Sequence, residues 1–160
     1  MKALIVYYSR TGNTAKIAQA INKEMDSNVE DIRDTKNRNG ISGFLISCME
    51  SALKKQPEIK KAKYNPDEYD LVIIGTPVWA GTIASPVRTY LEQYKKSFKA
   101  AAYFYTSDSN GNAKVLREME ILAGCKAEAL LEITKTDLAT ETFQEKVKIF
   151  VQELLQSQVY

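Results

Sequence analysis

Short apolar runs alternate with amphipathic stretches along the whole chain. Residues 3–8 form an unbroken apolar run, which is typical of a parallel strand covered on both faces. Residues 13–26 instead place apolar side chains at helical spacing, at Ile17, Ala18, Ile21 and Met25. The pattern therefore predicts a buried strand followed by a helix that packs one face on it.

The same alternation continues to the end of the chain. It predicts further strands at residues 29–32, 71–74, 101–105 and 129–134. It predicts further helices at residues 44–54, from Ser85-Pro86 onward, at 113–123 and at 141–155. The last helix carries an apolar stripe of Phe143, Val147, Phe150, Val151 and Leu154. We expect Gly75 to stop the third strand, at 71–74, and Gly124 to end the helix at 113–123. The strand at 129–134 is less apolar, so we place it at a sheet edge.

Strands that alternate with helices predict an α/β fold, a parallel sheet with helices on both faces. The chain has 160 residues, so we predict one domain spanning residues 1–160. The longest irregular part is 33–69, where the only regular element predicted is the helix at 44–54. Long connections in compact domains often carry function.

Composition removes several classes of protein. The chain has 22 Lys+Arg and 20 Asp+Glu, which argues against binding nucleic acid mainly by charge. Its apolar runs are far shorter than the roughly 20 residues of a membrane helix, and no secretory leader is predicted. The sequence has no histidine, which excludes a Ser-His-Asp triad and His-ligated zinc. Cys48 and Cys125 are interpreted as thiols of a cytoplasmic protein.

Polar loops follow three of the predicted strands. Ligands of open α/β sheets bind beyond the carboxyl ends of the strands, so these loops are where we expect a site. The first loop contains Ser9, Arg10, Thr11, Gly12, Asn13 and Thr14. The second contains Thr76, Pro77, Val78, Trp79, Ala80 and Gly81. The third contains Thr106, Ser107, Asp108 and Asn112.

The first loop suits an anion. It lies between a buried strand and a helix, whose N-terminus offers free amides and a partial positive charge. Ser9, Thr11 and Thr14 add hydroxyl donors, and Gly12 lets the backbone curl around a phosphate monoester. The alternative is that the loop simply caps its helix.

The other two loops suit a flat ring. Trp79, the only tryptophan, stands at a strand end beside Pro77, where it would wall an aromatic ligand. The alternative is a Trp folded onto the core. The third loop offers amides and hydroxyls to a ring edge, or is a plain solvated turn. A phosphate at one end and an aromatic system at the other indicate FMN as the ligand.

At these residues the sequence resembles the flavodoxin family. Ser9-Arg10-Thr11-Gly12-Asn13-Thr14 matches the family's [T/S]-x-T-G-x-T phosphate loop at every defined position, and Gly75-Thr76-Pro77-Val78-Trp79 resembles its second flavin loop. The resemblance covers the whole chain in element order. It implies a flavodoxin-like three-layer sandwich with a five-stranded parallel sheet in order 2-1-3-4-5, the family being itself a standard example of the binding-edge rule. It also implies the short-chain type, without a long insertion before the last helix.

Two features differ from that family. Electron-carrying flavodoxins are typically acidic, whereas this chain has a formal net charge of +2. Many short-chain flavodoxins place Gly directly after the Trp, where this chain has Ala80. In those proteins the peptide at that Gly can flip to bond the reduced flavin. Because Ala resists positive φ, we expect Gly81, one residue later, to take over this flip.

Three functions compete. The first is a low-potential one-electron carrier that binds FMN through the three loops and needs no catalytic side chain and no metal. Its partners would be a reductase donor and an acceptor enzyme, and it would be a monomer or weak dimer. The second is an FMN-dependent NAD(P)H:quinone or flavin reductase, with a lid or dimer surface in residues 33–69. The third is a binding module whose loops hold another phosphorylated aromatic, or no ligand. We favour the carrier.

Overall fold

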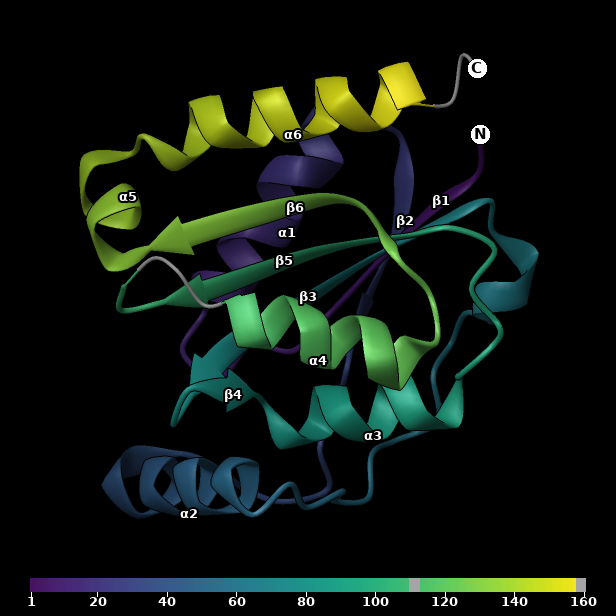
Figure 1. Ribbon diagram of the computed structural model, residues 1–160. Coiled ribbons are helices and arrows are strands. Elements are labelled where there is room, and N and C mark those ends of the chain that lie inside the picture. The colour runs from purple at the N-terminus through teal and green to yellow at the C-terminus, as the bar shows by residue number, and fades with distance from the viewer. Residues whose placement is uncertain (110–112, 158–160) are drawn as a thin grey trace.

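A parallel β-sheet runs through the middle of the molecule (Figure 1). The computed structural model describes residues 1–109 and 113–157. The parallel strands are β1 (Ala3–Tyr7), β2 (Ser27–Asp31), β3 (Leu71–Trp79), β5 (Ala101–Ser107) and β6 (Ala127–Thr134). Their order across the sheet is β2-β1-β3-β5-β6, so the predicted 2-1-3-4-5 arrangement of parallel strands and the edge position of the last one are confirmed.

A sixth strand was not predicted. β4 (Thr82–Ile83) turns back from the end of β3 and pairs with it antiparallel, Val78 opposite Ile83. Two residues after a tight turn are too short to carry an alternating hydrophobic pattern, and this is why the sequence does not reveal the strand.

Helices cover both faces of the sheet (Figure 1). α1 (Asn13–Glu24) and α6 (Phe143–Ser157) lie on one face, and α3 (Ser85–Gln93) and α4 (Ala113–Ala123) on the other. The predicted stripe of α6 is buried against α1 and the sheet, through Phe143, Val147, Phe150, Val151 and Leu154. Gly124 ends α4 with a φ of 67°, as predicted.

Three further elements complete the chain. α2 (Gly40–Ala52) lies beyond α3, outside the two helical layers (Figure 1), and the one-turn η1 (Pro66–Glu68) leads into β3. The predicted helix at 141–155 starts two residues later than expected, because the short α5 (Lys135–Thr140) precedes it. A capping box fixes α5: Thr134 caps the backbone N–H of Asp137, and the Asp137 carboxylate accepts from the Thr134 N–H.

Gly75 does not stop the third strand; that prediction was wrong. It lies inside β3, opposite Phe104 of β5. A Cβ at Gly75 would come within 2.0 Å of the Phe104 ring. The glycine is therefore required by the close approach of that ring, and β3 continues through the residues expected to form the second loop.

In the described part of the chain, none of the helices has the length and apolar character needed to cross a bilayer.

Candidate functional site

The segment that follows β1, the end of β3 with its turn, and the end of β5 meet around one hollow at the carboxyl end of the sheet. Its volume is about 400 Å³. The first segment contributes Ser9, Arg10, Thr11, Asn13 and Thr14. The second contributes Pro77, Val78, Trp79 and Ala80, and the third contributes Thr106, Ser107 and Asp108. Residues predicted from three separate parts of the sequence thus line the same space.

Three of the predicted residues that the structure describes stand apart from this lining. Gly12 is the N-cap of α1, where its positive φ turns the first segment into the helix, and Gly81 lies at the tip of the β3–β4 turn. Thr76 is fully buried; its hydroxyl donates to the Pro77 carbonyl (2.8 Å) and accepts from the Ala84 N–H (3.0 Å). Thr76 therefore holds the hairpin in place and does not face the hollow. Asn112 lies outside the described residues.

The N-terminus of α1 is open toward the hollow. Gly12, at the N-cap, has a φ of 97°, which glycine adopts at little cost. Its N–H donates to the Ser9 hydroxyl (3.1 Å), which closes the turn. Within the described residues no side chain caps this helix, and its first turn carries no acidic residue. The capping alternative is therefore not what the structure shows, and the helix end keeps free amides and a partial positive charge for an anion.

A buried hydrogen bond ties the first segment to the third. The Thr14 and Thr106 hydroxyls lie 2.8 Å apart, both in the floor of the hollow. One hydroxyl donates to the other, so the hydrogen of the acceptor remains available for a ligand.

The second segment is a two-residue hairpin. Ala80 and Gly81 both have positive φ, 50° and 74°, as a type I′ turn requires. The expectation that Ala80 would resist positive φ was wrong, whereas Gly81 does adopt the positive φ expected of it. Glu118 of α4 holds the returning strand, because it accepts from the Thr82 hydroxyl and from Arg88 (2.6 Å).

Trp79 both packs on the core and lines the hollow. It is only 7% exposed and packs edge-on against Tyr8, with ring centroids 5.6 Å apart. It nevertheless lines the hollow, with Pro77 and Val78 beside it. Burial raises the pKa of Tyr8 to about 12, so its phenol stays neutral at physiological pH.

Four lining residues were missed in the sequence: Phe44 and Cys48 from α2, and Lys135 and Leu138 from α5. Lys135 directly follows β6, so the strand-end rule applied to the last strand would have found it. No local signal places α2 at the hollow. The Arg10 guanidinium lies over the Phe44 ring, 5.0 Å from its centroid, and so joins α2 to the first loop.

The charges around the hollow are few. Lys135 pairs with Asp108 (2.7 Å) at the exposed rim. Burial raises the pKa of the Cys48 thiol despite the nearby Arg10, so the thiol is protonated at neutral pH. Arg10 makes no ion pair with a carboxylate of the described residues. The hollow therefore offers positive charge and hydroxyls beside α1, an apolar wall at Pro77, Val78 and Trp79, and polar groups again at Thr106, Ser107 and Asp108.

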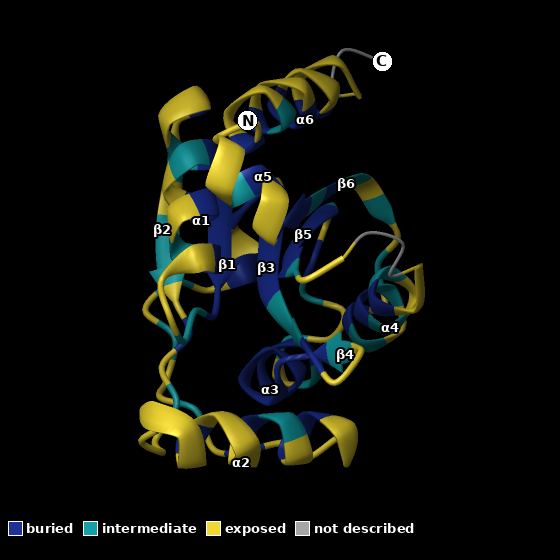
Figure 2. Ribbon diagram, turned by 90° about the vertical axis from the view of Figure 1, so that its left-hand side faces the viewer, coloured by how far each residue is buried: buried dark blue, intermediate teal, exposed yellow. Residues whose placement is uncertain are grey.

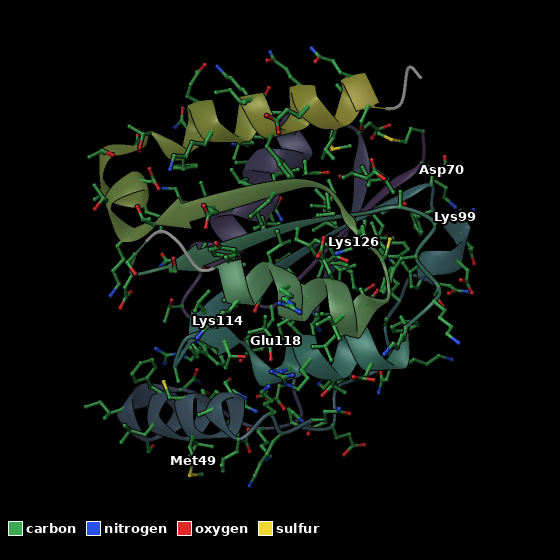
Figure 3. The ribbon with its side chains drawn as sticks, viewed as in Figure 1. Met49, Asp70, Lys99, Lys114, Glu118 and Lys126 are labelled. Atoms are coloured by element: carbon green, nitrogen blue, oxygen red, sulfur yellow. The ribbon has the colours of Figure 1, made fainter. Side chains whose placement is uncertain are left out.

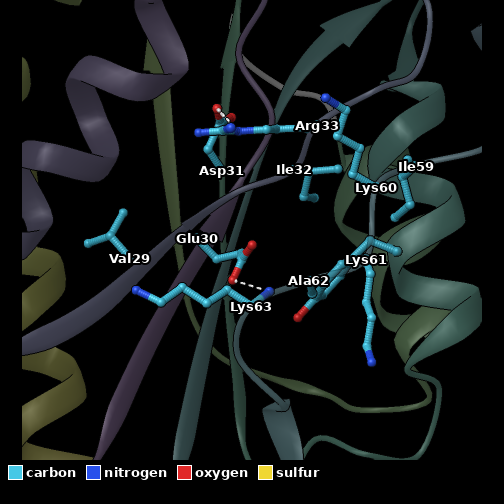
Figure 4. Close-up of a pocket in the computed structure, with 11 residues that line it drawn as sticks. Val29, Glu30, Asp31, Ile32, Arg33, Ile59, Lys60, Lys61, Ala62 and Lys63 are labelled. Atoms are coloured by element: carbon cyan, nitrogen blue, oxygen red, sulfur yellow. Dashed lines mark hydrogen bonds and ion pairs between the residues drawn. The ribbon is translucent and has the colours of Figure 1, made fainter.

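A second hollow of about 400 Å³ lies at the outer edge of β2 (Figure 4). It is lined by residues 29–33, residues 59–63 and Tyr90. The Glu30 carboxylate spans it to accept from the Lys63 N–H (3.0 Å). None of the predicted site residues lines it, so we place the candidate site at the first hollow.

The sequence comparison agrees with this geometry. The family model described as flavodoxin matches residues 2–126, more than three quarters of the chain. The chain belongs to the flavodoxin family. No curated protein matches its sequence.

Solved structures share the flavodoxin fold. A flavoprotein from Lactobacillus acidophilus NCFM, solved in complex with FMN, is 29% identical; it superimposes with a TM-score of 0.67 over 89% of this chain and 97% of its own. Oxidised Flavodoxin 2 from Bacillus cereus is 20% identical, with a TM-score of 0.62 over 98% of this chain and 99% of its own. The second likeness speaks for the fold alone.

Proposed function

We propose that this flavodoxin-family protein binds FMN in the hollow below the three strand-end segments and carries single electrons at low potential. The observation that carries the proposal is the composition of that hollow. An open helix N-terminus and hydroxyls lie at one side, Trp79 with Pro77 and Val78 forms an apolar wall, and Thr106, Ser107 and Asp108 add hydrogen-bonding groups. A ligand with a phosphate monoester at one end and a flat aromatic ring at the other matches this arrangement. Family membership and the FMN bound to the L. acidophilus flavoprotein support the same cofactor.

The first segment would hold the phosphate. The amides of Asn13 and Thr14 begin an uncapped helix, and the Thr11 hydroxyl lies beside them in the lining. Arg10 adds a charge that no carboxylate of the described residues neutralises. The Ser9 hydroxyl, which already accepts from Gly12, keeps the turn in shape.

The other segments would hold the ring. Pro77, Val78 and Trp79 would cover one side, and Thr106, Ser107 and Asp108 would line the other, together with Asn112 as predicted. FMN supplies the redox chemistry when bound. Apolar walls disfavour a gain of negative charge by the ring and so lower its reduction potential, an effect that Arg10 partly offsets.

The side chains favour a carrier over an enzyme. The ionisable groups described around the hollow are Arg10, Cys48, Asp108 and Lys135. Asp108 and Lys135 pair with each other at the surface, and Cys48 is held protonated by burial. Transfer of single electrons needs none of them as a proton donor or acceptor.

A second candidate is an FMN-dependent NAD(P)H:quinone or flavin reductase. The observation that favours it is the wall contributed by α2, where Phe44 and Arg10 stack beside the hollow. This wall comes from the long segment 33–69, and it would give a second aromatic reactant a surface to lie on.

The test is reconstitution followed by an assay. The purified protein is mixed with FMN or with riboflavin, desalted, and examined by visible absorption and flavin fluorescence. We expect retention of FMN with quenched fluorescence and much weaker retention of riboflavin. Equal retention of both would remove the phosphate assignment, and retention of neither would remove the proposal. The holoprotein is then given NAD(P)H and a quinone: a carrier oxidises almost none in steady state, whereas sustained turnover would favour the reductase.

A further inference from the structure

α2 buries its small and polar side and exposes its apolar side. Its buried residues are Gly43, Ser47, Glu50 and Ser51, so small and polar groups face the protein. Its large apolar side chains face outward: Ile41 is 82% exposed, Leu45 61%, Met49 51%, and Leu53, just after the helix, 61%. Figure 2 shows the outer side of α2 as exposed, and in Figure 3 Met49 points away from the rest of the molecule. A helix that covers its own core would show the opposite pattern.

Buried ion pairs fix this orientation. Arg38, only 4% exposed, donates to the carboxylates of Asp34 and of Glu50 (2.6 Å). Lys36 adds a second ion pair to Glu50, at 2.5 Å. Rotation of α2 to bury its apolar side would leave Arg38 and Asp34 buried without Glu50, at a cost that the apolar burial would have to exceed. The outward apolar face is therefore held in place by the fold.

Gly43 adds a second restraint. A Cβ at this position would lie 2.3 Å from the Arg38 backbone, so α2 sits directly on the segment before it. No larger residue fits between them, and the helix cannot sink or turn without breaking this contact.

The exposed face is continuous and none of its own side chains is charged, although the Arg10 guanidinium lies over the Phe44 ring at its flank. Ile41, Leu45 and Met49 follow one another at a spacing of four residues and form a single ridge. Ile46 and Leu53 flank the ridge on one side and Phe44 on the other. Glu50, the only Asp, Glu, Lys or Arg within the helix, faces inward. Apolar patches of this kind on soluble proteins mark contact surfaces.

We infer that this face of α2 is the contact between two copies of the chain. A two-fold axis brings identical surfaces together, so a charged surface would repel itself, and the ridge of Ile41, Leu45 and Met49 has no charged side chain to do so. Ridges spaced by four residues interdigitate when two helices cross at about −50°. Six exposed apolar side chains on each copy, at on the order of 100 Å² each, supply about 1,200 Å² from the two copies together, the lower end of what a specific interface buries.

A charge-steered redox partner fits this face less well. Such partners are attracted by a field of opposite sign, and the side chains of the ridge supply none. The hollow beside it is bordered by Phe44 and Cys48, so a second copy seated on α2 would lie next to the cofactor site. The contact itself depends only on α2 and holds whether or not FMN is the ligand.

Sedimentation of the full chain tests the inference. We expect dimers that dissociate on dilution, with the same behaviour in the presence and absence of FMN. Leu45→Glu combined with Met49→Glu weakens the dimer by about a hundredfold or more, because four carboxylates would meet in the interface. The matched control is Ile121→Glu, which puts a carboxylate at a 59% exposed isoleucine of α4 and leaves the dimer unchanged.

Hydrogen exchange of the unchanged chain gives a second readout that no folding defect can affect. We expect amides of residues 40–53 to gain protection as protein concentration rises. A monomer at every concentration overturns the inference, whatever else covers α2. A dimer that survives the double substitution, or exchange in 40–53 that ignores concentration, overturns it as well.

Discussion

The hydroxyls of Thr14 and Thr106 lie 2.8 Å apart although 92 residues separate them in the chain. Thr14 stands in the first turn of α1 and Thr106 near the end of β5. Both are buried, at 1% and 7% exposure. The bond therefore joins the proposed phosphate end of the hollow to the segment proposed to line the ring.

The Thr14–Thr106 pair should couple in a double-mutant cycle. Thr14→Val or Thr106→Val alone leaves one buried hydroxyl without its partner and lowers the free energy of unfolding by about 1–3 kcal/mol. The double variant should lose far less than the sum, because both polar groups are then gone while the shape is kept. Urea unfolding of FMN-free protein measures all four forms. Strictly additive losses would show that the bond contributes nothing.

A negative charge at the start of α1 should separate cofactor affinity from stability. Asn13→Asp places a carboxylate beside the free amides of the helix, where it raises the stability of FMN-free protein by about 0.3–1 kcal/mol. The same carboxylate repels the phosphate, so FMN affinity should fall about five- to tenfold while riboflavin affinity is unchanged. The matched control is Gln19→Glu, the same charge change on the exposed middle of α1. Equal effects of the two variants on FMN would contradict the phosphate assignment.

The hairpin after β3 should tolerate glycine at position 80. Ala80 has a φ of 50°, which costs an L-residue about 1–2 kcal/mol. Ala80→Gly removes that cost, but it also gives the unfolded chain more conformational freedom, which lowers stability by about 0.5–1 kcal/mol. We therefore expect the free energy of unfolding to rise by about 0.5–1 kcal/mol. Ala52→Gly, at an exposed helical position with ordinary φ, should instead lose about 0.5–1 kcal/mol. Thermal unfolding compares them; equal losses would mean that Ala80 carries no strain.

Acid should weaken the junction of β6, α5 and α6 through Asp137. Burial opposes the charge of Asp137, but hydrogen bonds from Lys146 (2.9 Å), Thr134 and Thr142 outweigh it and hold its pKa well below the usual range. A depressed pKa contributes stability above about pH 4, the ordinary Asp pKa, and that contribution disappears as the pH falls through the folded value. Asp137→Asn should cost about 1–3 kcal/mol at pH 7, and the difference from wild type should shrink below about pH 4.

The control for Asp137 is Asp26→Asn, at an exposed carboxyl. It should follow the wild-type stability curve across the acid range. If Asp137→Asn and wild type differ by the same amount at every pH, the carboxylate charge is not what stabilises this junction.

Much of the architecture follows from hydrophobic periodicity. The stripe from Phe143 to Leu154 predicts its helix and its buried face, because an amphipathic helix encodes its own partner surface. The loops after β1, β3 and β5 meet because carboxyl ends of parallel strands share one edge. The features that the sequence does not predict depend on contacts between residues far apart in the chain. Gly75 is set by Phe104 of a neighbouring strand, and α2 meets the first loop through the contact of Phe44 with Arg10, which no local pattern encodes.

The packing of α1 on α6 makes the phosphate end of the hollow depend on the last part of the chain. Ile17 and Ile21 share a buried cluster with Val147 and Phe150, and the Lys16 ammonium lies 4.7 Å from the Phe143 ring centroid. During synthesis the ribosome delivers every residue of the three segments long before α6 emerges. A nascent chain that already holds all its candidate cofactor contacts therefore lacks the brace that positions α1. We therefore expect a chain cut before α6 to position the start of α1 poorly and to bind FMN more weakly than the full chain.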